Sequence, residues 1–294
     1  MGFWIRSGCI TKSDGRRYKQ QWFTFFNRSA PDENFGIKRV KYEVSSIVKD
    51  ITKIRHLEGT IEWEGRMIKW NILINPVSHL HHHIPSIFYT LPFPATKVVS
   101  YPVVVLNGTI DINGKVFHLK DEKGCLGSIW GSNYEKAWAY FHCNSFTHND
   151  GFIEGVSGSI VITRNLIMRP FMFVISADKE TFRFNRLRDL FFNGCRWEKG
   201  RIVFWRKGLY TRIYGELRCR DQDIIAGIYD DTDDTYVYCY HTEVGDCSVV
   251  IEKRHSIGSP WNILYKLAST GLCHFEYGSM KSDQSLRYVY EMIQ

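Results

Sequence analysis

Short runs in which apolar and polar residues alternate dominate the chain. Tyr236, Tyr238 and Tyr240 are each separated by one residue, and residues 21–26 alternate in the same way. In an extended strand every second side chain lies on the same face, so this spacing indicates half-buried β-strands. Gly, Asn and Asp interrupt the runs at short intervals. Many short strands separated by such turn residues predict an all-β protein made of barrels or half-barrels with few short helices.

Two turns and one short helix stand out within this pattern. Asn113-Gly114 is a strong hairpin signal, because a type I′ turn needs positive φ at both central residues. Glu64-Gly65 is a weaker version, and residues 59–70 resemble residues 108–119 around it. Both segments predict strand, tight turn, strand. Residues 185–192 predict a short helix that ends at the following Asn-Gly pair.

The chain divides into two halves at a soft boundary. Residues 76–101 contain four prolines and predict a long irregular connection. A polar, Gly-containing stretch lies at residues 149–151. We therefore expect an N-terminal β domain over 1–149 and a C-terminal β domain over 150–294.

Composition narrows the class of partner. The chain has 294 residues, 15% of them aromatic, and a formal net charge of +7. Its basic residues are scattered, whereas nucleic-acid binders usually cluster them, so we expect no nucleic acid and instead a small hydrophobic molecule as the partner. The charge allows weak, peripheral attraction to an anionic membrane. The sequence leaves the oligomeric state open.

Cysteine usage and the N-terminus indicate a cytoplasmic location. None of the eight cysteines forms a Cys-x-x-Cys pair, and no run of about 18 apolar residues occurs. The first residues lack the basic-then-apolar order of a signal peptide. We expect reduced thiols, with a bridge between Cys219 and Cys239 as the one alternative.

The most informative stretch lies between residues 130 and 146. From Trp138 onward, large aromatic or polar residues alternate with small or apolar ones. As a strand, this segment would place five side chains on one face: Trp138, Tyr140, His142, Asn144 and Phe146. An aromatic row with a few polar groups is typical of a ligand cavity. The alternative is an outer face on which the His is hydrogen-bonded.

This stretch resembles the central signature of the tocopherol cyclase-like proteins. The chain reads Asp121-Glu-Lys-Gly-Cys-Leu-Gly-Ser-Ile-Trp-Gly131 and then Trp138-x-Tyr-x-His-Cys-Asn-x-Phe146. The family reads roughly Gly-Tyr-x-Glu-Lys-Asn-Trp-Gly and then Trp-x-Trp-x-Gln-x-Asn-x-Phe. Residues 3–26, with their Tyr-x-x-Gln-Trp-Phe-x-Phe-Phe ending, are similar to the start of the related carotenoid 1,2-hydratase (hydroxyneurosporene synthase) proteins.

The resemblance implies two lipocalin-like barrels packed side by side, with a pocket for a long isoprenoid. Its members protonate or hydrate carbon–carbon double bonds, or close rings. Such chemistry needs an acid in a dry pocket and gains from an aromatic wall that stabilises a carbocation. On this basis we expect the ligand to contact six residues: Trp130, Asn133, Trp138, Tyr140, Asn144 and Phe146.

The chain departs from the family at its charged positions. Gly127 and Ser128 occupy the family's acidic and basic positions, and the carotenoid hydratases carry a His where this chain has Ser128. If the chemistry is kept, the proton could come from His142, Glu154 or Asp121, and the spacing compels none of them. His142 is the first choice, because it lies among aromatic residues and titrates near neutral pH.

Two further motifs favour structural roles. His81 and His83 would share a strand face while His82 would not, and we expect a polar loop beside the pocket mouth rather than a metal site. The acidic run 230–234 lacks the Gly and the distal Glu of an EF-hand and predicts a hairpin turn. We expect no metal and no other cofactor.

Three hypotheses remain at this stage. The first is a cofactor-independent cyclase, hydratase or isomerase that donates a proton to a double bond of a long apolar substrate. The second is a carrier or sensor of a similar ligand, because the family's charged positions are lost. The third is an interaction protein with no pocket.

Overall fold

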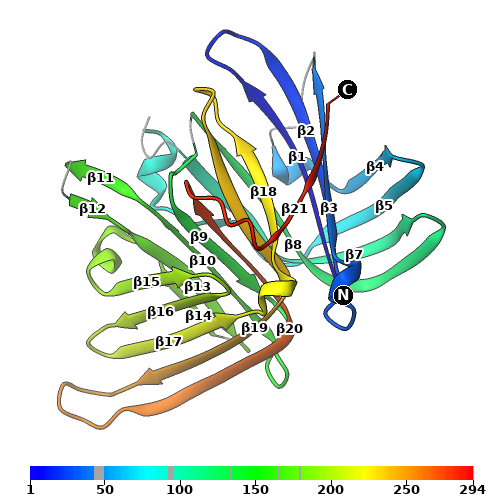
Figure 1. The fold of residues 1–294 in the computed structure, drawn as a ribbon. Coiled ribbons are helices and arrows are strands. Elements are labelled where there is room, and N and C mark those ends of the chain that lie inside the picture. The colour runs from blue at the N-terminus through cyan, green and yellow to red at the C-terminus, as the bar shows by residue number, and fades with distance from the viewer. Residues whose placement is uncertain (43–49, 92–95, 133, 164–165, 179, 294) are drawn as a thin grey trace.

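The described part of the chain is built mainly of β-strands (Figure 1). The computed structural model describes residues 1–42, 50–91, 96–132, 134–163, 166–178 and 180–293. In these residues the helices are short 3-10 turns, η1 (Pro31–Glu33), η2 (Ile51–Lys53), η3 (Ser86–Tyr89), η4 (Leu187–Phe191) and η5 (Asp221–Asp223). None of their helices is long and apolar enough to cross a membrane.

The N-terminal half is made of two sheets that pack face to face. One has the order β1-β2-β3-β22, and the other has the order β4-β5-β7-β6, with β8 paired to β7. Their bounds are β1 (Gly2–Thr11), β2 (Arg17–Phe26), β3 (Phe35–Tyr42), β4 (His56–Trp63), β5 (Arg66–Pro76), β6 (His81–His82), β7 (Thr96–Ile112), β8 (Lys115–Gly131) and β22 (Tyr290–Ile293). Between them lies a core that includes Phe23, Ile61, Trp70 and Val104.

The C-terminal half is one large sheet with the order β14-β13-β10-β9-β20-β19-β17-β16-β15, and β18 and β21 lie off this path. The bounds are β9 (Trp138–Cys143), β10 (Gly151–Gly158), β13 (Phe171–Ala177), β14 (Glu180–Phe184), β15 (Asn193–Glu198), β16 (Arg201–Lys207), β17 (Thr211–Arg218), β18 (Ile225–Asp230), β19 (Tyr236–Lys253), β20 (Asn262–Ser279) and β21 (Arg287–Tyr288). A separate hairpin joins β11 (Ile160–Thr163) to β12 (Leu166–Met168).

This large sheet curls into a nearly closed barrel. The amide of Asn193 in β15 donates to the carbonyls of Phe171 in β13 and Phe184 in β14, and so links the two ends of the sheet. The barrel interior is filled by side chains, among them Phe141, Phe173, Phe204 and Phe275. A ligand of the expected size therefore has no room inside this half among the described side chains.

The turns follow the sequence pattern. Asn113 and Gly114 have φ of 54° and 86°, and Glu64 and Gly65 have φ of 45° and 74°, so both pairs adopt the left-handed backbone that a tight hairpin requires. The acidic run joins β18 to β19, as expected. The predicted helix at 185–192 is the short η4, and β15 begins directly after it.

Two details differ from the sequence expectation. Residues 76–101 contain the short strand β6, which pairs with β7 and places His81 and His83 inside the protein rather than in a polar loop. Strand β9 ends at Cys143, so the alternation stops there, and Phe146 packs against the core of the opposite face. Phe146 is therefore not part of the expected row.

The two halves share strands across the expected boundary at residues 149 and 150. β9 precedes this boundary but lies in the middle of the large sheet, between β10 and β20. β22 ends the chain and returns to pair in parallel with β3 (Figure 1). The division into 1–149 and 150–294 stays a prediction. All eight cysteines are free, so Cys219 and Cys239 form no bridge.

Candidate functional site

A polar row crosses the outer face of the large barrel, where that barrel packs against the N-terminal half. His142 in β9 lies directly opposite Glu154 in β10 and His274 in β20. Residues that are directly opposite in an antiparallel pair share a face. Tyr140 and Trp138 continue the same face of β9, while Phe141 and Cys143 point into the filled barrel. The expected two-faced character of residues 138–143 is confirmed.

Glu154 is the centre of this row. Its side chain is fully buried, and it accepts hydrogen bonds from the Tyr140 hydroxyl and, at 2.6 Å, from the Ser100 hydroxyl of β7. His83 Nε2 lies 3.3 Å from the carboxylate and 3.2 Å from Ser100 Oγ. A buried carboxylate is costly unless it is hydrogen-bonded and paired. Here donors from three separate segments of chain meet one carboxylate between the halves.

The electrostatics favour the charged form of Glu154. Burial by itself would raise the pKa of this carboxyl, but His83, His142 and the Ser100 hydroxyl together lower it below its ordinary value. Burial, Cys125 and Glu154 raise the pKa of the Tyr140 hydroxyl well above its ordinary value. At neutral pH the pair therefore consists of an ionised carboxylate and a phenol that keeps its proton.

Strand β6 brings the histidines to this carboxylate. His81 and His83 are buried with ring centroids 4.7 Å apart, and His82 between them is exposed. Arg183 of β14 contacts His81 Nδ1 at 3.2 Å, and Asn185 donates to the His82 carbonyl at 2.7 Å. Burial is the main reason that the pKa of His81 falls to about 3. The predicted shared face of His81 and His83 is confirmed, and it places the His83 ring against the Glu154 carboxylate.

The row continues toward a second acid–base pair. The His274 ring lies 5.5 Å from the Tyr140 ring, and His274 Nδ1 is 2.6 Å from Glu243 Oε1. His241 is close by, and burial together with His274 and Arg6 lowers its pKa to about 3. The ligand atoms of His241, Glu243 and His274 all lie within 4.8 Å of one another, so these residues could hold a metal ion.

A second group that could hold a metal is buried in the C-terminal barrel. The sulfur atoms of Cys143, Cys247 and Cys273 lie within 4.8 Å of one another. Three thiolates would suit a soft metal. This group points into the filled core, away from Glu154, because Cys143 lies on the opposite face of β9. The expected absence of a cofactor stays a prediction.

Several expected site residues do meet at this interface. His142 Nε2 is 2.7 Å from the Pro102 carbonyl, and Asn144 donates to the carbonyls of Pro102 and Gly124. Asn144 therefore holds β9 to the strands of the N-terminal half. Trp138 is buried, and its indole donates to Glu276 at 3.0 Å.

Other expected residues lie elsewhere. Asp121 is exposed on β8 and hydrogen-bonded to Asn107, apart from the Glu154 network. Trp130 is 46% exposed and contacts only the ring of Tyr89 among the described aromatic residues. Asn133 lies outside the described residues. The roles assigned to these residues from the sequence stay predictions.

Sequence reasoning missed the residues that face β9 from the N-terminal half. Ser100, His83 and Cys125 all approach Glu154 or Tyr140. The alternation of His81 and His83 was the one available signal, because it placed both on one strand face. Nothing local to Ser100 distinguishes it from any other serine in a strand.

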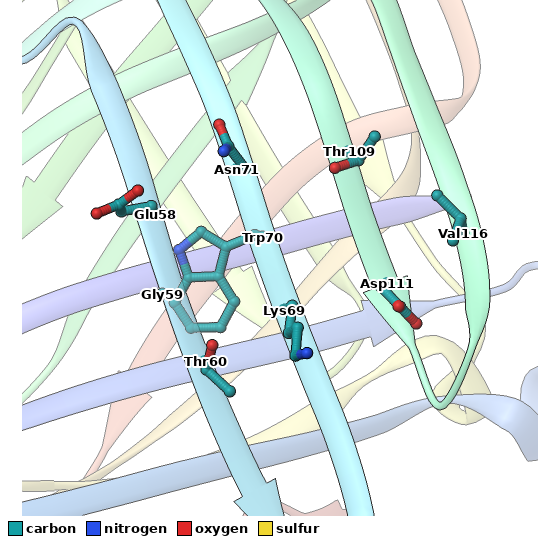
Figure 2. Close-up of a pocket in the computed structure, with 9 residues that line it drawn as sticks. All are labelled: Glu58, Gly59, Thr60, Lys69, Trp70, Asn71, Thr109, Asp111 and Val116. Atoms are coloured by element: carbon teal, nitrogen blue, oxygen red, sulfur yellow. The ribbon is translucent and has the colours of Figure 1, made fainter.

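A hollow on the described surface lies elsewhere, on the N-terminal half. It has a volume of about 530 Å³ and is lined by Glu58, Gly59, Thr60, Lys69, Trp70, Asn71, Thr109, Asp111 and Val116. Figure 2 shows these residues spread over the neighbouring strands β4, β5, β7 and β8, with the Trp70 indole beside Gly59. This hollow contains no hydrogen-bonded acid–base network like that of Glu154.

The interface between the two halves, in contrast, contains side chains that are only partly exposed to solvent. Cys125 and Tyr140 lie deep enough that burial is the largest cause of their raised pKa values, yet neither is fully covered. Arg6 and Tyr134 in the same interface are also only half-buried. These groups therefore keep some exposed surface although they lie between the two halves.

Comparisons with known proteins bear on the fold. No family model matches the sequence, and no curated protein matches it significantly. Among solved structures, the chain is similar to kievitone hydratase from Nectria haematococca, with 13% identity and a TM-score of 0.50 over 95% of this chain and 89% of that chain. A protein provisionally named AttH from Nitrosomonas europaea matches at 11% identity and a TM-score of 0.46, over 94% of this chain and 91% of that one. The first likeness confirms the expected fold, an all-β protein of two lipocalin-like halves packed together.

Proposed function

We propose that this protein is an enzyme of the hydratase or isomerase type, which acts on a carbon–carbon double bond of an apolar substrate between its two halves. The observation that carries the proposal is Glu154, a fully buried carboxylate held by Tyr140, Ser100 and His83. The fold shared with kievitone hydratase supports the class of reaction. The long isoprenoid substrate is part of the proposal and comes from the sequence resemblance.

The chemistry needs one group that accepts a proton and one that returns it. In a hydration, one carbon of the double bond takes a proton from the network in which His83 and Tyr140 touch the carboxylate. Water then bonds to the other carbon, which carries the positive charge, and Glu154 takes the proton that this water releases. Water adds across the bond, and the network returns to its starting state without an oxidant or reductant. His142, next to Glu154 in the row, remains the alternative donor.

The assignment of roles differs in one respect from the sequence expectation. Glu154 was one of three candidate proton donors, but its lowered pKa favours the carboxylate at neutral pH. We therefore assign it the role of base. The aromatic rings of Trp138 and Tyr140 would stabilise positive charge on the substrate.

Replacing Glu154 tests the proposal. The purified protein is incubated in D₂O with a panel of polyprenyl-quinols and carotenoids, and products are followed by mass spectrometry for added water or exchanged deuterium. Glu154→Gln keeps the size of the side chain but removes the base, and we expect turnover to fall about 100-fold or more. Glu122→Gln is the matched control, because Glu122 is exposed on β8 and is not a candidate donor, and it should leave turnover unchanged.

The carrier hypothesis makes a different prediction in the same experiment. Native mass spectrometry would then show a lipid retained after purification, and no member of the panel would be converted. Equal turnover by the wild type and Glu154→Gln would rule out the assigned base.

A further inference from the structure

Three side chains with metal-binding atoms meet on strands β19 and β20, at the end of the polar row. His241 and Glu243 are two residues apart in β19, and His274 comes from β20. Their ligand atoms all lie within 4.8 Å of one another, and His274 Nδ1 is 2.6 Å from Glu243 Oε1. Two imidazole nitrogens and one carboxylate oxygen form a donor set that zinc and similar transition metals bind in proteins.

A bulge in β19 lies at this point. The register of β19 against β20 shifts between Thr242 and Gly245. Two residues of β19, Glu243 and Val244, therefore lie opposite the single residue His274. Within the bulge the Thr242 hydroxyl accepts a hydrogen bond from the Val244 N–H at 3.2 Å. Bulges of this kind re-aim side chains and are common beside functional sites. Here the bulge contains the residue that supplies the carboxylate.

His241 is the member of the group whose polar atoms the fold does not use. It is 3% exposed, and its Nδ1 is buried with no hydrogen-bond partner among the described residues. The rings of Trp4 and Phe26 cover it, with centroids 4.9 and 5.4 Å from that of the imidazole. A buried polar atom without a partner costs free energy of folding, and an apolar side chain would pack here without that cost. A metal ion would give the ring a polar partner.

The charges around the group favour a bound cation. Burial by itself would lower the pKa of His274, but the carboxylates of Glu243, Glu276 and Glu154 raise it above its ordinary value. Arg6 is the opposing charge that acts on the group. Negative charge therefore exceeds positive charge among these neighbours, and a divalent ion would reduce the excess.

An ion needs little room in this place. Zinc–ligand distances of about 2.0–2.2 Å set neighbouring ligand atoms about 3.3 Å apart. Atoms that already lie within 4.8 Å reach this spacing by side-chain movements of about 1 Å, and no ligand-sized cavity is required, because the ion bonds directly to them. The side chain of Glu243 is 15% exposed, so the carboxylate connects the group to solvent.

We propose that His241, Glu243 and His274 bind a divalent transition-metal ion, for which zinc is the best match. The proposal departs from the sequence expectation of no metal, because the bulge and the burial of His241 depend on how distant strands pack. The ion would lie where β1 and β2 of the N-terminal half cover β19, since Trp4 and Phe26 belong to those strands. Binding needs no substrate, so the inference does not rest on the proposed function.

The test measures zinc binding by the full-length chain. Metal-free protein is prepared by dialysis against a chelator, and zinc is then added, or cobalt(II) as a spectroscopic probe of the ligands. We expect visible cobalt absorption without the intense near-ultraviolet band of thiolate ligands, and no competition by magnesium or calcium. Zinc at about 100 times its Kd should raise the Tm by about 5 °C.

Two substitutions separate a metal ligand from a structural histidine. His241→Leu removes a nitrogen that has no partner, so the metal-free variant should be at least as stable as the wild type. Its zinc affinity should fall about 100-fold, and zinc should no longer raise its Tm. Glu243→Gln keeps the size of the side chain and should weaken zinc to a similar extent. Circular dichroism confirms that each variant is folded.

The buried cysteine group supplies the matched control. Cys247→Ser removes one of its three thiols and should bind zinc as the wild type does. Three results would overturn the proposal: no zinc binding by the metal-free wild type, unchanged affinity in both His241→Leu and Glu243→Gln, or loss of binding in Cys247→Ser alone, which would place the ion among the cysteines.

Discussion

At the scale of single residues, Glu154 shows how the protein stabilises an ionised side chain that is buried away from water. The carboxylate accepts from Tyr140 and Ser100, and His83 completes its surroundings. Tyr140 comes from the neighbouring strand β9, Ser100 comes from β7 of the N-terminal half, and His83 directly follows β6. A donor set of this kind stabilises the ionised form against the cost of burial. The same residues that make the carboxylate a base also couple it to the stability of the fold.

The pH dependence of stability follows from this coupling. The pKa of Glu154 is lowered in the folded protein relative to an ordinary value of 4.5, so its ionised contacts stabilise the fold above about pH 4.5. This contribution is lost as the pH falls below 4.5 toward the folded pKa, because the carboxyl is then protonated. We expect the free energy of unfolding of the wild type to fall more steeply than that of Glu154→Gln between pH 6 and pH 3, as measured by urea denaturation.

The wild type and Glu154→Gln share the other titratable groups around this carboxyl, which are His81, His83, His142, His274, Tyr140 and Cys125. Asp121→Asn, at an exposed position, serves as the control for removal of a carboxyl group in general. Parallel curves for the wild type and Glu154→Gln would show that Glu154 carries no such linkage.

At the scale of elements, the short strand β6 is what brings a histidine to the carboxylate. β6 has only two residues and pairs with β7 at Ser100 and Val99. Its other side is held by Asn185, which donates to the His82 carbonyl at 2.7 Å. A strand this short gains little from its own ladder, so contacts from the neighbouring barrel decide whether it stays in place.

Asn185→Ala should therefore loosen β6 without unfolding the protein. Loss of one hydrogen bond costs about 1 kcal/mol, which corresponds to roughly fivefold easier local opening. We expect amides of residues 79–85 to exchange about fivefold faster in hydrogen-exchange mass spectrometry. Asn149→Ala is the matched control, because Asn149 makes a similar side-chain bond in an exposed turn, to Asp178 at 3.3 Å. Identical exchange in both variants would mean that Asn185 does not hold β6.

The sequence predicts elements far better than it predicts the site. Alternation reveals β9 and the hairpin turns at 113–114 and 64–65, because each depends on residues close together in the chain. Alternation also brings out His142, whereas Glu154 is only one of three candidate donors and its spacing does not single it out. Alternation cannot show that Ser100 and Glu154 meet, since that contact depends on how the two halves pack. The early end of β9 was also hidden, because the alternating pattern runs on to Phe146 after the strand has stopped.

At the scale of the whole molecule, the two halves are tied together by exchanged strands. β9 lies between β10 and β20 in the C-terminal barrel, although the chain reaches it before leaving the N-terminal half. β22 pairs with β3, and its Glu291 lies 2.8 Å from Lys38, which is 1% exposed and also contacts Asp230 at 2.6 Å. Because the buried Lys38 pairs with carboxylates of two different segments, the C-terminal strand β22 is anchored to the interior of the protein.

This arrangement predicts where the chain can be cut. A fragment of residues 150–294 lacks β9, so β10 and β20 lose the strand between them and the row of Phe141 is missing from the barrel core. A fragment of residues 138–294 keeps both. Because an unpaired strand edge and a missing core side chain are each destabilising, we expect a cooperative thermal transition for 138–294 and none for 150–294. Calorimetry on the two purified fragments, with the full chain as reference, measures whether each one unfolds in a cooperative transition. Equal cooperative transitions in both would show that β9 is dispensable to the barrel and would favour the boundary at residues 149 and 150.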